Sequence, residues 1–309
     1  MEQAIVYIGI DVAKAYLDVS WAGEARRFSN EEKGHAALMR WLKTSRAPVQ
    51  LICEASGGYE RALLESLAEG ELAVTLVQAV RVRQYARAAG ILAKTDRIDA
   101  RVLEAFGAAL RPKPTAPLSG QQKRLRELES QRRHLSQVLR AEENRLAQLQ
   151  CAELRSLGRS LINKIGKQID AIEECISSLI AQEQTLCAKA QKLTAVIGVG
   201  ARTAALVLAQ MPELGQLNRR QAAALAGLAP FNHDSGSLRG KRAIFGGRRA
   251  LRSGLYMAAL AAARYNPILS RFYQRLRAKG KPHQLALTAV MRKLLLALNH
   301  TLKPLPYTT

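Results

Sequence analysis

The chain has 309 residues, of which 48% are hydrophobic, enough for two or three modest domains with cores of their own. Its formal net charge of +22 favours a polyanionic partner, most commonly nucleic acid, over a generally basic surface or an anionic membrane. The four cysteines show neither CxxC spacing nor metal-site pairing with the five histidines, which argues against a disulfide framework or a zinc site. We therefore expect reduced thiols and a bacterial or archaeal cytoplasmic location at the nucleoid.

Two further features argue against export or membrane insertion. The N-terminus opens directly on a strand pattern and lacks the basic and apolar regions of a signal peptide. The most apolar helix near the C-terminus is interrupted by Arg292 and Lys293, so we expect no membrane partner.

The basic residues are distributed unevenly along the chain. The segment 191–309 carries 19 Lys and Arg but only two acids, Glu213 and Asp234, and its part after Asp234 carries 15 Lys and Arg and no acid. The segment 1–190 is nearly balanced, with 28 basic and 23 acidic side chains. The cations of the last segment therefore need partners from elsewhere, and phosphates are the obvious ones.

The N-terminal part alternates strand and helix signals. Short apolar or alternating runs predict strands at 6–10, 16–21, 25–29, 49–53 and 72–77, and amphipathic patterns predict helices at 31–43 and after Gly57-Gly58. Three hairpin strands followed by alternating helices and strands indicate an α/β domain with a mixed sheet flanked by helices.

The middle of the chain predicts a linker and two long helices. The proline-rich segment 111–117 cannot continue a helix. Beyond it, apolar residues follow 3-4-7 spacing from Leu125 to Leu149 and again from Leu161 to Leu179, and Gly158 is the expected break between the two helices. The stripes fit a helical hairpin, an intermolecular coiled coil or the face of a plain bundle.

The last region is predicted to be all-α, with one interrupting loop between Pro230 and Gly247. Its start resembles a helix-hairpin-helix, in which Gly198, Gly200 and Arg202 would bring backbone amides and a helix N-terminus close to a DNA phosphate. We thus expect domains at 1–110 and 191–309, a linker at 111–118 and a helical oligomerisation region at 119–190.

Four carboxylates in the first domain are candidates for one site. Asp11 and Glu54 each follow a predicted strand, and Asp96 and Asp99 are three residues apart, on one face of a helix. Glu60 is an alternative candidate to Glu54, and Asp18 is a further candidate for the site. Each residue has an ordinary alternative, such as capping a turn or balancing nearby cations.

Carboxylates gathered in one pocket repel each other unless a hard cation lies among them. Oxygen ligands favour Mg²⁺, with Mn²⁺ as the alternative. Two such ions can clamp a phosphodiester and stabilise charge on the attacking and leaving oxygens.

The loop after Pro230 carries a hydroxyl group among cations. Ser235 is followed by Gly236 and Gly240, which give backbone freedom, and its proton could be taken by Asp234, by His233 or by a metal. Ser237 competes with Ser235, and phosphate binding competes with covalent catalysis. Candidate nucleic-acid contacts in and after the loop are Arg239, Lys241, Arg242, Arg248, Arg249 and Arg252.

Several motifs in a fixed order resemble the IS-one-ten family of insertion-sequence transposases, which is related to the Piv invertases. They are GIDVAKAYLDV, CEASGGYE and KTDRIDA within the segment 1–110, then IGVGARTA, ALAGLAP, DSGSLRGKR, GGRRALRSGLYMAAL, RYNP and AVMRKLL. The resemblance covers nearly the whole chain.

The resemblance implies an RNase H/RuvC-like N-terminal domain whose metal site maps to Asp11, Glu54, Asp96 and Asp99. It also implies a C-terminal transposase domain with Ser235 as nucleophile, which favours Glu54 over Glu60 and Ser235 over Ser237. A coiled coil would join the domains and support a homodimer or tetramer. An RNA encoded by the element would select donor and target double-stranded DNA.

Two other functions stay open from the residues themselves. One is a RuvC-like, metal-dependent endonuclease that cuts branched DNA with water, and the other is a nucleic-acid-binding scaffold from a decayed element. The complete carboxylate set argues against the second.

Overall fold

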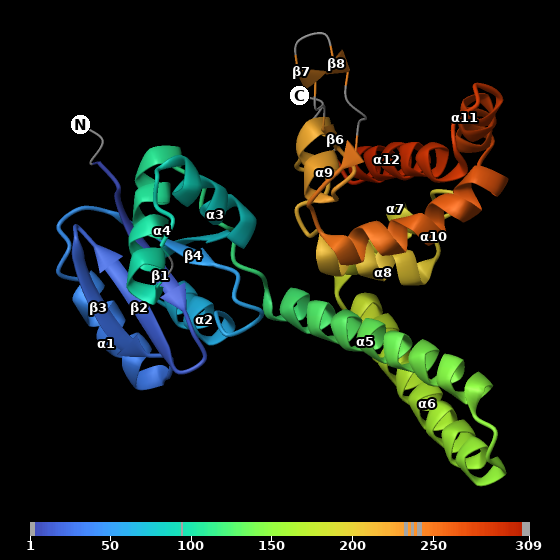
Figure 1. The fold of residues 1–309 in the computed structure, drawn as a ribbon, viewed down its shortest axis with the longest axis horizontal. Helices are drawn as coiled ribbons and strands as arrows, with labels where there is room; N and C mark the ends of the chain where they lie inside the picture. Colours follow the sequence, from blue (N-terminus) through green and yellow to red (C-terminus); the bar gives the residue numbers. More distant parts are fainter. Residues whose placement is uncertain (1–3, 94, 232–233, 236–237, 240–242, 305–309) are drawn as a thin grey trace. The chain divides into compact units, whose positions relative to one another are not determined.

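The computed structural model describes residues 4–93, 95–231, 234–235, 238–239 and 243–304. The chain divides into two compact units, Met1–Pro117 and Leu118–Thr309 (Figure 1). The boundary lies in the proline-containing segment that the sequence predicted as a linker. The predicted further division at residue 190 stays a prediction.

The first unit is an α/β domain. Its strands are β1 (Val6–Val12), β2 (Tyr16–Trp21), β3 (Glu24–Ser29), β4 (Val49–Glu54) and β5 (Ala73–Val77), and its helices are α1 (Glu32–Leu42), α2 (Arg61–Glu69), α3 (Ala79–Ala88) and α4 (Asp96–Leu110). All five strands predicted from the sequence are present, so the expectation of an α/β domain is confirmed.

The five strands form one mixed sheet in the order β3-β2-β1-β4-β5. The hairpin-linked strands β1, β2 and β3 pair antiparallel, whereas β1 with β4 and β4 with β5 pair parallel. The parallel pairs are connected through α1 and α2, because a parallel connection needs a crossover segment. This topology places β1 at the centre, with its C-terminal end beside that of β4.

Helices cover both faces of this sheet (Figure 1). One apolar layer joins Ile8, Ile10 and Leu51 of the sheet to side chains of α1 and α2. The other joins Ile52 and Val77 to side chains of α3 and α4. Because side chains alternate along a strand, the residues between those of the first layer face α4.

Helix α4 crosses the sheet at unusually close range. A methyl group added at Gly9 would lie 2.0 Å from the carbonyl oxygen of Ala100, and one at Gly107 would lie 2.7 Å from the side chain of Ile52. Only glycine leaves room for this approach. Gly9 therefore sets how closely the first part of α4 approaches β1, and Gly107 sets how closely its last part approaches the sheet.

The second unit is mainly helical. Its helices are α5 (Gly120–Gln148), α6 (Ala152–Gln182), α7 (Gln184–Thr194), α8 (Ala201–Gln210), α9 (Arg219–Leu225), α10 (Arg249–Tyr265), α11 (Pro267–Ala278) and α12 (His283–Thr301). Four two-residue strands, β6 (Pro230–Phe231), β7 (Asp234–Ser235), β8 (Leu238–Arg239) and β9 (Ala243–Ile244), lie between α9 and α10.

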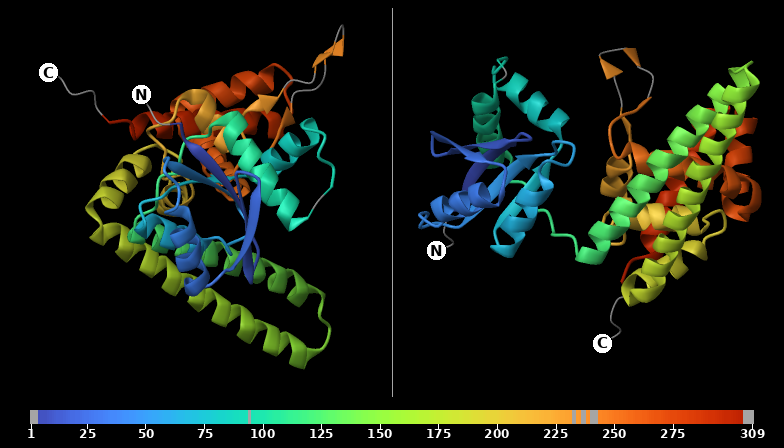
Figure 2. Two further views of the ribbon diagram at one scale, coloured as in Figure 1. Left: turned by 90° about the vertical axis from the view of Figure 1, so that its left-hand side faces the viewer. Right: turned by 90° about the horizontal axis from the view of Figure 1, so that it is seen from below.

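Helices α5 and α6 pack against each other as a hairpin, in agreement with one of the predicted arrangements (Figure 2). Leu125, Ile176 and Leu179 belong to the same apolar core as α7, α8, α10 and α12. The predicted break at Gly158 is wrong: Gly158 lies inside α6, and the chain turns at residues 149–151. A methyl group at Gly158 would lie 3.1 Å from Leu146 Cδ1, so this glycine lets the two helices approach closely.

The expected loop after Pro230 contains two short pairs of strands in its described part. Strand β6 pairs with β9, and β7 pairs with β8 with Ser235 opposite Leu238. In the part of the chain that the structure describes, no helix is long and apolar enough to span a membrane.

Candidate active site

Asp11 and Glu54 lie on the same face of the sheet, at the C-terminal ends of two adjacent parallel strands. The register pairs Ile10 with Cys53, so Asp11 and Glu54 are the next residues along each strand. Ile10 and Cys53 both belong to the layer against α1 and α2. By alternation the two carboxylates therefore face α4.

Asp96 and Asp99 occupy the first turn of α4, on the same side of the sheet. Thr95 caps this helix by accepting a hydrogen bond from the Ile98 amide at 3.3 Å. Further toward the C-terminal end of α4, the Glu104 carboxylate accepts hydrogen bonds from Ser20 Oγ at 2.6 Å and from the Ala22 amide at 2.8 Å. Glu104 thus fastens α4 to β2 and, together with Gly9, sets the position of the two aspartates.

The pKa of Asp11 reflects this gathering of carboxylates. Burial of the side chain is the largest cause and repulsion by Asp99, Asp96, Glu54 and Asp18 adds to it, raising the pKa of Asp11 from 3.8 to about 6. The four carboxylates predicted from the sequence therefore lie close enough to interact through their charge.

The donor chemistry of this cluster fits a hard divalent cation such as Mg²⁺, because every side chain offers only oxygen. A cation there would relieve the repulsion that raises the pKa of Asp11. Among the described residues, however, no three acidic, histidine or cysteine side chains already converge as a ready-made metal site. The carboxylates are thus neighbours whose side chains would have to rotate inward around an ion.

Arg27 supplies a positive charge at the edge of the cluster. It lies opposite Asp18 in the β2–β3 register and donates to both oxygens of that carboxylate, at 3.1 and 2.8 Å. It also approaches Asp96 at 3.7 Å and stacks over the ring of Tyr16 at 4.0 Å. Asp18, the additional carboxylate of the sequence analysis, is thereby engaged in an ion pair in which Asp18 is buried and Arg27 is half exposed.

Glu60, the alternative to Glu54, forms hydrogen bonds with the loop that precedes it. Its carboxylate accepts hydrogen bonds from the Ser56 amide and hydroxyl and from the Gly58 amide, at 2.9 to 3.2 Å. Burial acts to raise the pKa of Glu60, but these hydrogen bonds outweigh it and lower the pKa. This use of Glu60 leaves Glu54 as the residue that faces α4.

The backbone of Ser235 lies in β7, where it pairs with Leu238 of β8. Asp234 lies opposite Arg239 in the same pair of strands. The predicted residues His233, Ser237, Lys241 and Arg242 lie outside the described residues.

The base of this segment is clamped by backbone contacts and two arginines. Gly227 and Gly247 both have positive φ, 65° and 69°, and a methyl group at Gly247 would lie 2.1 Å from the Gly227 nitrogen. Arg252 donates to the Gly246 carbonyl at 2.6 Å. Arg248 donates to the Gln210 carbonyl at 2.7 Å and pairs with Glu213 at 2.6 Å. Arg252, which also donates to the Gly227 carbonyl at 3.5 Å, therefore joins the two ends of the segment, whereas Arg248 fastens its base to the end of α8.

The predicted helix-hairpin-helix region joins α7 to α8 through Gly198 and Gly200. Gly198 has a φ of 103°, and a methyl group there would lie 2.6 Å from the Ala262 side chain, so this glycine is needed for packing on α10. Gly200 is the N-cap of α8. Its position keeps the N-terminus of α8 open, which is compatible with the predicted phosphate contact.

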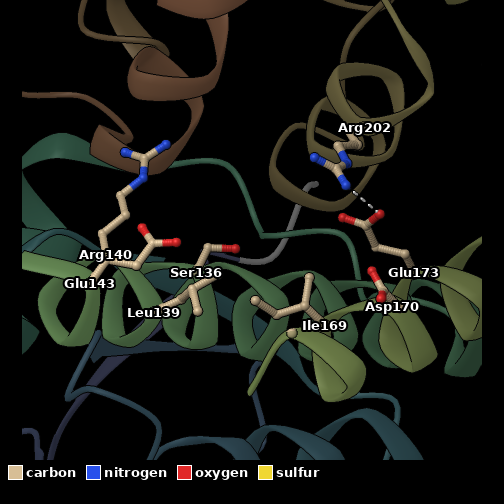
Figure 3. Close-up of a pocket in the computed structure, with 9 residues that line it drawn as sticks. Ser136, Leu139, Arg140, Glu143, Ile169, Asp170, Glu173 and Arg202 are labelled. Carbon is tan, nitrogen blue, oxygen red and sulfur yellow. Dashed lines mark hydrogen bonds and ion pairs between the residues drawn. The ribbon is translucent and has the colours of Figure 1, made fainter. Parts of the chain in front are cut away.

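Arg202 is engaged within the chain. It pairs with Glu173 of α6 at 2.8 Å, beside a pocket of about 290 Å³ between α5 and α6 (Figure 3). Glu173 also lies 3.8 Å from Arg132, which binds the fully buried Glu129 at 3.1 Å. This network of ion pairs connects the helical hairpin to α8. Arg249, by contrast, is exposed at the start of α10.

The sequence analysis missed two positioning residues, Arg27 and Glu104. Opposite charges at Asp18 and Arg27 could have signalled a cross-strand pair once the hairpin register was known. Glu104 gave no such signal, since its partners Ser20 and Ala22 lie more than 80 positions away in the chain.

Known protein families account for most of the chain. A family model described as a transposase matches residues 8–150, and a model described as a transposase of the IS116/IS110/IS902 family matches residues 190–274. The chain belongs to the IS110 family of transposases. This transposase is 31% identical over 301 residues to the pilin gene-inverting proteins of Moraxella lacunata and Moraxella bovis, covering 94% of this chain and 93% of each relative.

A shorter similarity points in the same direction. An uncharacterised 43.6 kDa protein of insertion element IS110 from Streptomyces coelicolor is 32% identical over 136 residues, covering 43% of this chain and 33% of that protein. The similarities identify the chain as a DNA transposase or recombinase, which confirms the family predicted from the motifs.

Proposed function

We propose that this transposase excises and inserts its element through a covalent bond between Ser235 and DNA, assisted by divalent cations at the carboxylate cluster. The observation that carries the proposal is the gathering of Asp11, Glu54, Asp96 and Asp99 on one face of the sheet. Burial and the neighbouring carboxylates raise the pKa of Asp11 to about 6, and a structural role would not require such repulsion.

Asp11, Glu54, Asp96 and Asp99 would hold Mg²⁺, or Mn²⁺ in its place. The ion, when bound, would withdraw charge from the scissile phosphate and stabilise the oxygens that attack and leave. Arg27 would keep Asp18 and Asp96 oriented at the edge of the cluster, and Glu104 would hold α4 against β2. These two residues act by positioning and do not touch the DNA.

Ser235 is the proposed nucleophile. Its Oγ–P bond forms as one P–O bond of the DNA backbone breaks, and the displaced sugar hydroxyl takes up a proton. The serine proton leaves to Asp234 or to His233; a metal ion, if bound nearby, would instead favour loss of this proton by stabilising the serine oxygen. Attack by a sugar hydroxyl on the phosphoserine reverses these steps and rejoins DNA without an external energy source.

The charge distribution supports a composite site. The segment after Asp234 contains no carboxylate, so metal ligands for the Ser235 region would come from the N-terminal unit. The proposed active site thus combines Ser235 of one chain with the carboxylate cluster, and a second subunit of a dimer or tetramer would supply that cluster.

A guide RNA encoded by the element is part of the proposal. It rests on the family resemblance and on the large excess of positive charge, which exceeds the needs of internal ion pairs. Double-stranded DNA at the element ends and at the target would be the substrate.

Covalent trapping tests this function. The full chain is incubated with end-labelled junction DNA, the flanking RNA and Mg²⁺, and the products are separated under denaturing conditions. A DNA-linked protein band that disappears with Ser235→Ala but persists with Ser270→Ala, a serine on α11, is expected.

The alternative function is a metal-dependent endonuclease that cuts branched DNA with water. The same carboxylate cluster favours it, since its chemistry does not require a serine. Cleavage that survives Ser235→Ala but is lost with Asp11→Ala would identify water as the nucleophile and overturn the covalent mechanism.

A further inference from the structure

A basic pocket lies on the C-terminal helices, among residues that the sequence analysis did not propose as a site. It has a volume of about 410 Å³ and is lined by Ile268, Arg271, Phe272, Arg275 and Lys293. The first four follow i, i+3, i+4, i+7 spacing along α11, so they share one face of that helix. Lys293 comes from α12, which packs beside α11.

The pocket combines cations with a ring that is partly buried against the core. Lys293 Nζ lies 4.2 Å from the centre of the Phe272 ring, and the Arg275 guanidinium lies 5.4 Å from it. Ile268 is 70% exposed at the rim. The apolar rim at Ile268 is therefore exposed to water, and a flat, apolar group of a ligand would cover it.

No carboxylate neutralises these cations within the described residues of this region. Arg271 uses its Nε to donate to the Pro267 carbonyl at 3.1 Å, and no acidic residue follows Asp234 in the whole sequence. Three positive charges around one ring repel each other, and an anion in the pocket would remove that repulsion.

From this arrangement we infer that the pocket binds an unpaired DNA nucleotide, with the base stacked on Phe272 and the flanking phosphates on Arg271, Arg275 and Lys293. Aromatic rings flanked by cations bind single-stranded nucleic acid in this way. A duplex keeps its base faces stacked, so it would use the cations without the ring. A volume of this size falls within the range of about 300–1,000 Å³ typical of small-ligand sites.

DNA is chosen as the occupant because the chain is a DNA transposase or recombinase, and strand exchange requires bases to leave the duplex. The inference rests on the DNA-handling part of the proposed function. It is independent of the serine chemistry and of the metal, so the two can fail separately.

The test measures equilibrium binding by the full chain in EDTA. The probes are a fluorescein-labelled 12-nucleotide single strand, its hairpin duplex and the RNA of the same sequence. Phe272→Leu keeps an apolar side chain against the core and removes the ring. We expect it to weaken single-strand binding by on the order of tenfold and duplex binding by less than about twofold.

Charge is tested separately on the same helix. Arg275→Ala should weaken single-strand binding and lower the slope of log affinity against log salt by about one. Arg277→Ala, two residues along α11 and outside the pocket lining, is the matched control and should leave the preference for single strands unchanged.

A stacking readout identifies the role of the ring. 2-Aminopurine in the single strand should be quenched by the wild type and by Ser235→Ala, but not by Phe272→Leu. Equal loss of single-strand and duplex binding in Phe272→Leu, no loss at all, or an effect confined to the RNA probe would each overturn the assignment.

Discussion

Asp11 is a single residue on which burial and like charge act together. Its carboxyl group faces Glu54 of β4, Asp18 of β2, and Asp96 and Asp99 of α4, and its pKa rises from 3.8 to about 6. Folding therefore shifts the Asp11 carboxyl group toward its protonated form, relative to the unfolded chain. The consequence is a dependence of stability on pH that is opposite in sign to that of an ion-paired aspartate, whose pKa is lowered in the folded state.

We expect the metal-free protein to lose stability as the pH rises from about 4 to about 6. Above the folded pKa both states are ionised, and the folded state bears the repulsion. The shift corresponds to at most about 3 kcal/mol, and solvent screening of this half-buried group reduces it to roughly 1–2 kcal/mol. Urea unfolding in EDTA between pH 4 and 7.5 measures this.

Asp11→Asn is the control, because an amide cannot ionise. The part of the pH slope due to Asp11 should be absent in this variant, and Mg²⁺ should stabilise the wild type more than the variant at pH 7.5. Identical slopes in the two proteins would contradict the prediction.

Glu173 forms an intramolecular ion pair with Arg202, a predicted DNA-binding residue. Glu173→Gln should release Arg202 from its 2.8 Å ion pair, and duplex DNA binding should tighten a few-fold with a salt slope steeper by about one. Anisotropy titrations at several salt concentrations check this. Glu174→Gln, an exposed neighbour on the same helix, removes the same charge without touching Arg202 and should have a smaller effect.

Among the elements, the contact between α4 and β1 decides the carboxylate arrangement. A methyl group at Gly9 would lie 2.0 Å from the Ala100 carbonyl and 2.4 Å from the Glu104 nitrogen, both backbone atoms that cannot move aside alone. The helix would have to shift as a body, taking Asp96 and Asp99 with it.

Gly9→Ala should therefore destabilise the protein by about 1–3 kcal/mol or more, and should weaken Mg²⁺ binding measured by calorimetry. Gly166→Ala is the matched control: nothing lies within 4 Å of its added methyl group in α6, so it should be neutral or stabilise by about 0.5–1 kcal/mol. Similar losses in both variants would refute a specific role for the α4–β1 approach.

The far part of the α5–α6 hairpin presents an uncovered apolar stripe. Leu154, Leu157 and Leu161 follow 3-4 spacing on α6 and are exposed, Leu157 by 68%. If this stripe mediates the proposed assembly, Leu157→Glu should shift the protein toward monomer in light scattering at micromolar concentration. Arg159→Glu, a charge change at an exposed position on the opposite face of the same helix, should not, and unchanged mass for Leu157→Glu would argue against this surface.

At the scale of the whole molecule, carboxylates and serine belong to different units. Unit Met1–Pro117 contains the four carboxylates and unit Leu118–Thr309 contains Ser235. A site shared between chains makes a specific prediction, because two different inactive subunits could then supply one intact set of groups.

Mixing equal amounts of Ser235→Ala and Asp11→Ala chains should restore about a quarter of all sites, one site in each mixed dimer, if each site takes its serine and carboxylates from different chains. Covalent DNA attachment in the mixture, absent from either variant alone, is the measurement. No recovery despite mixed assembly shown by light scattering would mean that each chain completes its own site.

The order of strands and helices in the first unit was predictable from the sequence, because period-2 and period-3.6 apolar patterns report local structure directly. The patterns at 6–10, 49–53 and 72–77 predicted buried strands that the structure contains. The motif order also predicted the family, which the comparisons confirm. The four carboxylates were proposed as a set from strand ends and helix spacing.

Tertiary structure alone decided what each of these residues contacts. The Gly158 break was wrong because a glycine within a helix can mark a close approach as well as an end. The contacts of Glu104 with β2 and the pairing of Arg202 with Glu173 join positions far apart in the chain, and no local pattern encodes such partners. Local propensity specifies elements, whereas packing and charge across the folded unit specify which side chains meet.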